Sequence, residues 1–273
     1  MSLLPERFDV AVAQWAALHR PRRAEVERRV RHNLAAVLGE PLDPSELDRW
    51  VERSLRSYAR YWAETFKLSR LAPEERSRRF CISEGREYLD DAHAAGRGVI
   101  VALPHVGNWD WGGSYIASVG MPMTVVAEKL EPIELFEFFT SQRRAVGVEV
   151  VGLDEEASSR LTRVLGAGGV VGLLCDRDIQ GNGIEVEFFS HRVTVPAGPA
   201  TLALRTGAAL VPAACFMGPG SDHFAAVGPP LDTNRRGRLR EDVTRVTQEL
   251  LYELEDLIRR APEQWHVLED RFA

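Results

Sequence analysis

The sequence predicts an α/β protein with a central mixed, largely parallel β-sheet flanked by helices, preceded by an N-terminal helical layer. Residues 6 to about 70 show helical periodicity and contain no convincing strand. After Pro73 short apolar runs alternate with amphipathic segments, which is the pattern of a sheet covered by helices. A chain of 273 residues with 45% hydrophobic and 27% charged residues is long enough to bury a large core. We therefore expect a helical layer over residues 1–72 and an α/β core over residues 73–273, packed as one compact unit.

The helical layer contains one clear helix start and an uneven distribution of charge. The run Asp43-Pro44-Ser45-Glu46 combines a capping side chain, a proline in the first turn and a reciprocal glutamate, so a long helix is expected from there to about Arg70. Arginines and aromatic residues interleave in this layer, which suits either an anionic membrane surface or the solvated faces of helices packed on the core. The residues concerned include Phe8, Val12, Trp15, Leu18, Arg20, Arg22, Arg28, Arg29, Arg31, Trp50, Arg56, Arg60, Trp62 and Phe66.

The core is expected to alternate strands and helices. Strands are predicted at Phe80–Ser83, Val99–Leu103, Met123–Val126, Val148–Val151, Val170–Cys175, Ile184–Phe188, Leu210–Phe216 and Phe224–Val227. Helices are predicted at 84–95, 109–119, 132–145, 155–166, 197–206 and 240–260.

Composition excludes several classes of protein. The three cysteines are widely spaced, which gives neither a zinc site nor a disulfide framework, and no metal site is expected. No apolar run approaches the roughly 18 residues of a membrane span, and the N-terminus lacks the apolar core of a signal peptide. A net charge of −6 argues against a general nucleic-acid binder.

The stretch from Val99 to Ser114 carries the most chemistry. The apolar run Val99–Leu103 predicts a buried strand that ends before His105, and Asn108 is suited to cap the helix that follows. Because the helix begins between them, His105 and Asp110 can meet, with Asp110 in the first turn. A histidine held by a carboxylate is a general base that lacks its own nucleophile, so the substrate must supply one. The alternative is a satisfied polar pair in a loop.

Other polar side chains follow predicted strands and reach the same edge of the sheet. Glu128 follows one strand, and Asp176, Arg177 and Asp178 follow another. Arg143 lies near a helix end, where a guanidinium suits a phosphate and also suits the helix dipole. Two neighbouring aspartates without further ligands do not make a metal site.

Glu185 lies on the predicted strand Ile184–Phe188. If the apolar residues of this strand face the core, Glu185 and Glu187 share the opposite face. They are therefore either part of a site or solvated carboxylates on an edge strand.

Several motifs occur in a fixed order: Pro104-His105-Val-Gly107-Asn108-Trp109-Asp110, Val-Ala-Glu128-Lys129, Cys-Asp176-Arg177-Asp178, Gly-Ile-Glu185-Val-Glu-Phe-Phe189, Pro-Ala-Gly198-Pro and Pro262-Glu-Gln-Trp265. In these motifs the chain resembles the bacterial lysophospholipid acyltransferase superfamily, in the branch of the lipid A late acyltransferases and the actinobacterial phosphatidylinositol mannoside acyltransferases. Ser190 departs from the glycine that is common after the Phe-Phe pair, and we expect no counterpart of the N-terminal membrane anchor of the lipid A enzymes.

The resemblance implies an activity and roles for these residues. The implied fold is that of the glycerolipid acyltransferases, and the implied reaction moves a long acyl group from acyl-CoA, such as palmitoyl-CoA, to a mannose hydroxyl of a phosphatidylinositol mannoside. No tightly bound cofactor and no acyl-enzyme are needed. His105 and Asp110 would form the base dyad, with Glu185 as a further catalytic residue. Substrate contacts are expected from Glu128, Arg143, Asp176, Arg177, Asp178, Gly107 and Asn108.

Further expectations concern the surroundings of this site. The amides near Gly107 to Trp109 are candidates for the oxyanion hole, and Phe136, Phe138 and Phe139 are candidates for the wall of an acyl groove. The protein is expected to be peripheral on the cytoplasmic side of the inner membrane, on an anionic surface. Transfer to another acceptor, a lipid A precursor or a lysophospholipid, and lipid binding without turnover remain alternatives.

Overall fold

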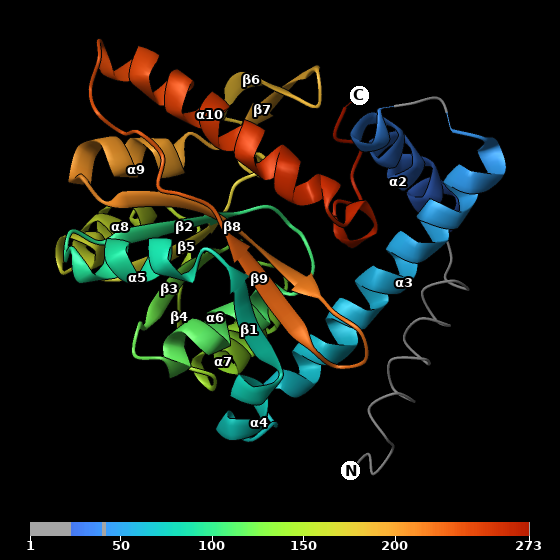
Figure 1. Cartoon of the computed structure of the whole chain (residues 1–273), viewed down its shortest axis with the longest axis horizontal. Coiled ribbons are helices and arrows are strands. Elements are labelled where there is room, and N and C mark those ends of the chain that lie inside the picture. Colours follow the sequence, from blue (N-terminus) through green and yellow to red (C-terminus); the bar gives the residue numbers. More distant parts are fainter. Residues whose placement is uncertain (1–22, 40–41, 273) are drawn as a thin grey trace.

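The computed structural model describes residues 23–39 and 42–272 (Figure 1). Its helices are α2 (Arg23–Leu38), α3 (Pro44–Leu68), α4 (Pro73–Arg78), α5 (Arg86–Ala94), α6 (Trp109–Ser118), α7 (Ile133–Arg144), α8 (Ala157–Gly166), α9 (Gly198–Thr206), α10 (Leu239–Arg259) and the short 3₁₀ helix η1 (Pro262–Gln264). Its strands are β1 (Phe80–Glu84), β2 (Val99–Leu103), β3 (Met123–Ala127), β4 (Val148–Gly152), β5 (Val170–Leu174), β6 (Ile184–Phe188), β7 (His191–Val195), β8 (Ala209–Met217) and β9 (His223–Val227).

Seven strands form the central sheet, in the order β1-β9-β8-β2-β5-β3-β4. Neighbouring strands are parallel except β8 and β9, which are antiparallel. The prediction of a mixed, largely parallel sheet flanked by helices is therefore confirmed. The predicted strands agree with the observed ones to within one residue at each end.

Strand β2 lies in the middle of the sheet and is buried on both faces, which explains its uninterrupted apolar sequence. Ile100 and Ala102 face a core made with α8, α9 and α10, whereas Val99, Val101 and Leu103 face a core made with α5 and α6. The two layers of helices hold the carboxyl end of β2, and the loop after it, in a fixed place.

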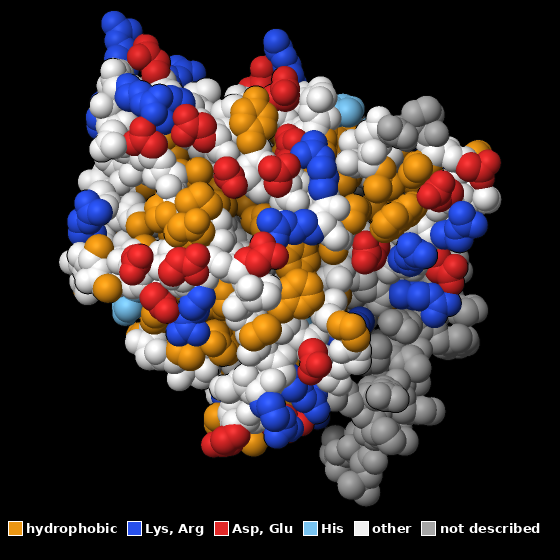
Figure 2. Space-filling view, viewed as in Figure 1, with side chains coloured by type: hydrophobic (Ala, Val, Ile, Leu, Met, Phe, Trp, Pro, Cys, Tyr) orange, Lys and Arg blue, Asp and Glu red, His pale blue; other side chains and the backbone are white. Residues whose placement is uncertain are grey.

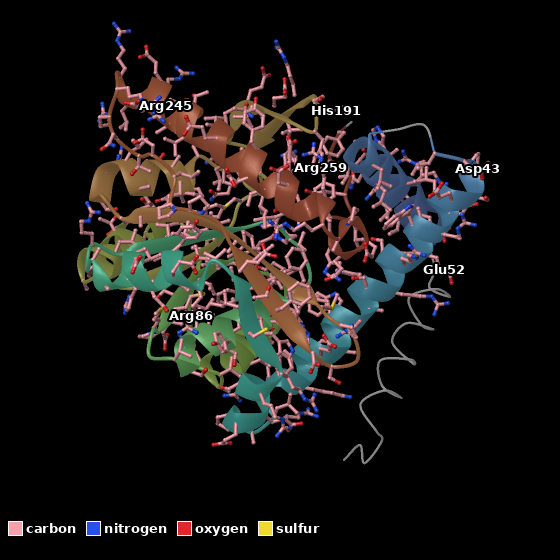
Figure 3. The ribbon with its side chains drawn as sticks, viewed as in Figure 1. Asp43, Glu52, Arg86, His191, Arg245 and Arg259 are labelled. Atoms are coloured by element: carbon pink, nitrogen blue, oxygen red, sulfur yellow. The ribbon has the colours of Figure 1, made fainter. Side chains whose placement is uncertain are left out.

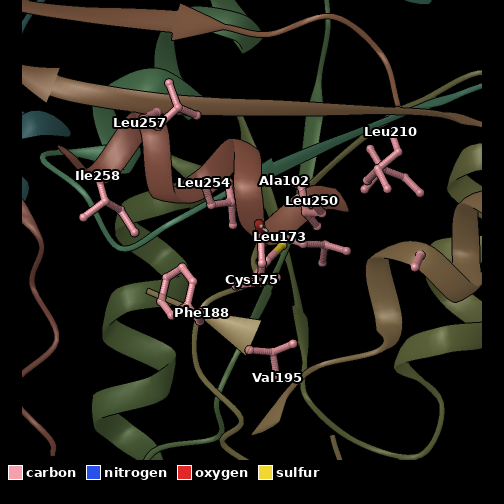
Figure 4. Packing of buried hydrophobic residues seen from close by; sticks show 14 of the residues in the cluster. Ala102, Leu173, Cys175, Phe188, Val195, Leu210, Leu250, Leu254, Leu257 and Ile258 are labelled. Atoms are coloured by element: carbon pink, nitrogen blue, oxygen red, sulfur yellow. Dashed lines mark hydrogen bonds between the residues drawn. The ribbon is translucent and has the colours of Figure 1, made fainter. Parts of the chain in front are cut away.

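Helix α10 covers the first of these cores. Leu250, Leu254, Leu257 and Ile258 point from α10 toward residues of β2, β5, β6, β7 and β8 (Figure 4). The opposite side of α10 is polar, and Arg245 and Arg259 lie along it (Figure 3). This amphipathic pattern is the reason why residues 239–259 form a surface helix.

Strand β7 differs from the sequence prediction. The sequence predicts no strand between Phe188 and the helix at 197–206, but residues 191–195 pair antiparallel with β6 in a two-stranded hairpin. Phe189 and Ser190 form its turn with φ of 50° and 62°. This is the left-handed region that glycine usually occupies in such a turn, so the sequence lacks the ordinary hairpin signal.

The long helix α3 begins as predicted, since the side chain of Asp43 accepts a hydrogen bond from the amide of Ser45 at 2.9 Å. Asp43 marks this start in Figure 3, with Glu52 further along the same helix. Four of the arginines in this layer have carboxylate partners on nearby helical turns or the neighbouring helix: Arg29 with Glu25, Arg31 with Asp48, Arg56 with Glu52 and Arg60 with Glu64.

Both signs of charge are mixed on the face shown in Figure 2. The residues Phe8, Val12, Trp15, Leu18, Arg20 and Arg22 of the expected basic and aromatic surface lie outside the described residues. Among the helices that the structure describes, none combines the length and the apolar character needed to cross a bilayer.

Candidate active site

His105 lies in the loop between β2 and α6, at the carboxyl edge of the sheet, and is 8% exposed. Asn108 caps α6 as predicted, because its side-chain oxygen accepts a hydrogen bond from the amide of Trp111. Gly107 has a φ of 61°, and a Cβ there would clash with the carbonyl oxygen of Cys215. The sharp turn that aims His105 away from the helix therefore depends on glycine at this position.

The carboxylate that contacts the His105 ring belongs to Asp176. Leu103 on β2 pairs in register with Leu174 on β5, so the residues two positions later, His105 and Asp176, emerge side by side. The Nδ1–H of His105 donates to Oδ1 of Asp176 at 2.5 Å, and the His105 amide donates to Oδ2 at 2.8 Å. Nδ1 is thereby fixed as the donor, which leaves Nε2 free to accept a proton.

Asp176 is fully buried and remains ionised. Burial alone would raise the pKa of its carboxyl group, but the charge of His105 and the hydrogen bonds from His105 and Trp265 outweigh that effect and lower the pKa to about 2. The indole N–H of Trp265 donates to Oδ2 at 2.7 Å. Asp176 was expected to contact substrate, but its carboxylate does not line the His105 cavity and instead contacts the inner side of the His105 ring.

Asp110 does not hold the His105 ring, contrary to the sequence prediction. Its Oδ1 accepts from Nε of Arg143 at 2.8 Å, and its Oδ2 accepts from the hydroxyl of Tyr61 at 3.1 Å. Asp110 raises the pKa of Arg143, and burial together with Asp110 raises the pKa of Tyr61 well above its usual value. The first turn of α6 directs this carboxylate toward α3 and α7, where it joins the helices.

Two of the amides expected in the oxyanion hole have other partners. The amide of Gly107 donates to the carbonyl of Gln264 at 2.9 Å, and the amide of Asn108 donates to the carbonyl of Cys215 at 3.0 Å. The side chain of Asn108 contacts Trp111 and Glu64. In this structure the amides of Gly107 and Asn108 therefore shape the loop.

His105 opens onto a cavity of about 560 Å³. The predicted substrate residues Glu128, Arg143, Arg177 and Asp178 all line it. The other lining residues are mostly apolar or aromatic. His105 thus faces a space that has a polar part and an apolar part.

Like Arg143, the side chains of Arg177 and Asp178 at this cavity already have protein partners. Arg177 makes two hydrogen bonds of 2.8 Å with Glu269, which raise the pKa of its guanidinium. Asp178 accepts from the amides of Gly181 and Gly183 and so shapes the loop before β6. These contacts hold both side chains at the cavity wall.

Glu185 lies elsewhere. Its exposed side chain is on β6 and pairs with Arg192 across the hairpin at 3.3 Å, and it is not among the residues that line the His105 cavity. Among the described residues, its surroundings match the alternative of a solvated carboxylate.

Sequence reasoning missed the contribution of α3 and of the C-terminal segment. Tyr58, Tyr61 and Trp62 of α3 line the cavity, as does His266. His266 is buried, and burial together with the nearby His105 lowers its pKa to about 3, so its imidazole stays neutral. Its position directly after the quoted Pro262–Trp265 motif was the only signal that could have found it.

A second, narrow cavity of about 90 Å³ lies between the sheet and α6. It shares Trp109, Val126, Arg143, Leu173 and Leu174 with the His105 cavity, so the two spaces adjoin. Its walls are almost entirely apolar and include glycines on α6 and β5. Of the three phenylalanines expected to wall an acyl groove, Phe136 and Phe139 line the larger cavity, whereas Phe138 lines neither cavity and is 42% exposed.

Comparison with known proteins identifies the family of this chain. The family model of the bacterial lipid A biosynthesis acyltransferases matches residues 1–273. A phosphatidylinositol mannoside acyltransferase of Mycolicibacterium smegmatis is 35% identical over 98% of this chain and 86% of its own length. A phosphatidylinositol mannoside acyltransferase of Mycobacterium tuberculosis is 37% identical over 89% of this chain and 76% of its own length. The chain is therefore an acyltransferase that belongs to the bacterial lipid A biosynthesis acyltransferase family.

Proposed function

We propose that this protein transfers a long acyl group from acyl-CoA to a mannose hydroxyl of a phosphatidylinositol mannoside, with His105 as the general base. The names of the two mycobacterial relatives support the acceptor. The observation that carries the proposal is the 2.5 Å hydrogen bond from His105 Nδ1 to buried Asp176, in the wall of a cavity with polar and apolar parts.

The proposed reaction is a direct transfer. Nε2 of His105 takes the proton of the sugar hydroxyl as its oxygen attacks the thioester carbonyl and forms the new C–O bond. The C–S bond then breaks, and the departing thiolate of coenzyme A receives the proton from His105. Asp176 stabilises the imidazolium between these steps, and positioned general-base catalysis of this kind contributes roughly 10²–10⁴-fold.

The two parts of the cavity suit the two ends of the reaction. Glu128 can accept hydrogen bonds from sugar hydroxyls, and Arg177 carries a guanidinium that suits phosphate. The narrow cavity beside α6 suits the acyl chain, since each methylene buried there contributes roughly 0.8 kcal/mol.

Assays of the purified protein with palmitoyl-CoA test the function. Phosphatidylinositol mannosides, a lipid A precursor and a lysophospholipid are offered in parallel, and release of coenzyme A is measured. We expect turnover with the mannoside and loss of turnover in His105→Ala, with the unfolding temperature retained. Turnover only with another acceptor would reassign the substrate, and binding without turnover would make the protein a lipid-binding protein.

We further propose that the protein works at the cytoplasmic side of the inner membrane as a peripheral protein. Trp62 of α3 and Phe139 of α7 line the His105 cavity, and Phe66 and Phe138 lie next to them, each 42% exposed. An apolar rim at the cavity suits a substrate that is drawn from a lipid surface. Sedimentation with liposomes of zwitterionic and anionic lipid tests this idea, and absence of binding to both would contradict it.

A further inference from the structure

We propose that Trp265 is a positioning residue of the general base, which acts on His105 through the carboxylate of Asp176. The proposal rests on the proposed role of His105 and adds a residue to it. Trp265 does not line the His105 cavity, so it would influence the reaction without touching either substrate.

The indole N–H completes the set of donors around Asp176. Oδ1 accepts from His105 Nδ1 at 2.5 Å, and Oδ2 accepts from the His105 amide at 2.8 Å and from Trp265 Nε1 at 2.7 Å. A carboxylate with donors on both oxygens cannot rotate without breaking at least one hydrogen bond. Its Oδ1 therefore stays aligned with the imidazole ring.

The indole ring is itself held in place. Trp265 is 3% exposed, and its ring packs against Phe188, Phe189 and Phe272 with centroids 6.0–6.1 Å apart. Arg271 adds a second brace, since its Nε donates to the main-chain carbonyl of Asp176 at 2.8 Å. The last residues of the described chain thus fix both the backbone and the carboxylate of Asp176.

The segment around Trp265 also pairs with the loop that carries His105. The amide of Gly107 donates to the carbonyl of Gln264 at 2.9 Å, and the amide of His266 donates to the carbonyl of His105 at 2.7 Å. The side chain of Gln264 in turn bonds the amide and the carbonyl of Met217 at 2.7 and 2.9 Å. Main-chain hydrogen bonds of the residues on both sides of Trp265 therefore fix the position of the indole relative to His105.

The chemical consequence is specific. Without the indole donor, Oδ2 keeps only the His105 amide, so the carboxylate holds more of its charge and is less firmly oriented. The carboxylate of Asp176 would then be a better hydrogen-bond acceptor and would favour the imidazolium form of His105. The other groups near the His105 ring are His266, which is neutral, and Trp109. The acid limb of the pH–rate profile should therefore move to higher pH, and kcat should fall while KM stays unchanged.

The test compares Trp265→Phe with Trp111→Phe. Both changes remove a buried indole, but no described residue accepts a hydrogen bond from Nε1 of Trp111. We expect kcat of Trp265→Phe to fall about tenfold, as for outer partners of metal-bound histidines, with its acid limb shifted upward. Trp111→Phe should retain the wild-type pH profile. His105→Ala is assayed in parallel, so failure of the proposed base is seen separately.

Two further measurements keep the proposal testable if Trp265→Phe fails to fold. Benzothienylalanine placed at position 265 keeps the shape of indole and replaces its N–H by sulfur, so it should reproduce the kinetic effect. The downfield proton resonance of His105 Nδ1–H is independent of turnover and should shift in this variant. If the benzothienylalanine variant keeps the wild-type kcat, pH profile and His105 proton resonance while His105→Ala is inactive, the positioning role is overturned and the proposed function stays intact.

Discussion

The carboxylate of Asp110 and the guanidinium of Arg143 form an ion pair of 2.8 Å that joins the first turn of α6 to the last turn of α7. Tyr61 of α3 donates to the other oxygen of the same carboxylate. Three helices whose residues line the His105 cavity are therefore joined at one buried charge. Asp110 supports the wall of this cavity, whereas Asp176 contacts the ring of His105.

This ion pair gives the first prediction. Arg143→Met leaves the buried carboxylate without its cation, so the free energy of unfolding should fall by about 3 kcal/mol, measured by urea denaturation. Arg144→Met is the matched control, because Arg144 is largely exposed and lies 3.5 Å from Glu149. Its effect should stay within about 0.5 kcal/mol. Equal stability of the two variants would contradict the structural role of Asp110.

The narrow cavity beside α6 gives a prediction about acyl length. Gly172 lines it, and a side chain there would project toward Met123 and Val125. Gly172→Val should therefore lower kcat/KM for long-chain acyl-CoA more than for short-chain acyl-CoA. Gly166→Ala, where a Cβ meets nothing within 4 Å, should leave the chain-length preference unchanged. An unaltered preference in Gly172→Val would place the acyl chain elsewhere.

His266 predicts how stability depends on pH. Its pKa is lowered from 6.5 to about 3 in the folded protein, mainly by burial, so the unfolded chain binds the extra proton first as the pH falls. Stability should therefore decrease as the pH falls from about 6.5 toward 3, by up to about 1.4 kcal/mol per pH unit from this group.

Urea denaturation at several pH values measures this slope. His266→Gln should flatten it, while Ser57→Ala removes the hydroxyl that contacts Nε2 at 2.9 Å and keeps the imidazole, so the slope should persist. The same slope in wild type and His266→Gln would show that other groups cause the acid sensitivity.

A buried pair outside the cavity gives a further stability prediction. His223 on β9 donates to Glu64 on α3 at 2.9 Å, and its ring stacks on Trp111. Burial would raise the pKa of Glu64, but the hydrogen bond and charge of His223 lower it below 4.5, so this carboxylate adds stability that is lost as the pH falls below that value.

His223→Phe preserves the stacking and removes the donor. At pH 7 it should lower the free energy of unfolding by about 1–3 kcal/mol, measured by thermal and urea denaturation. His93→Phe is the control, since no described residue bonds Nδ1 of His93, and it should have the smaller effect. The reverse order would contradict the pairing of Glu64 with His223.

Local signals in the sequence predicted much of the fold and one residue, His105, of the pair that it forms with Asp176. The apolar run of β2, the turn at Gly107 and the cap at Asn108 are all encoded within a few residues, so the placement of His105 could be derived from them. The partner of His105 could not. Asp110 and Asp176 both lie near the edge of the sheet where β2 ends. Choosing Asp176 requires knowing that β5 is the neighbour of β2, which depends on the strand order of the whole sheet.

Other contributions come from distant segments for the same reason. Trp265 and His266 reach His105 only because η1 and the residues after it pair with the loop at Val106. The hairpin of β6 and β7 was missed because its turn uses Phe189 and Ser190 in a conformation typical of glycine. The pairing of the C-terminal segment with this loop joins parts of the chain that are far apart in sequence, so no local pattern predicts it.

We propose that Asp176, and not Asp110, is the carboxylate that makes His105 a base. The direct measurement is kcat and its pH profile for acyl transfer by Asp176→Asn and Asp110→Asn, each checked for folding by thermal denaturation. We predict a fall in kcat of about 10⁴-fold for Asp176→Asn, the scale seen when a triad loses its carboxylate. Asp110→Asn should lose stability and raise KM while keeping the wild-type pH profile. A near-normal kcat in Asp176→Asn, with loss of turnover in a folded Asp110→Asn, would contradict the account.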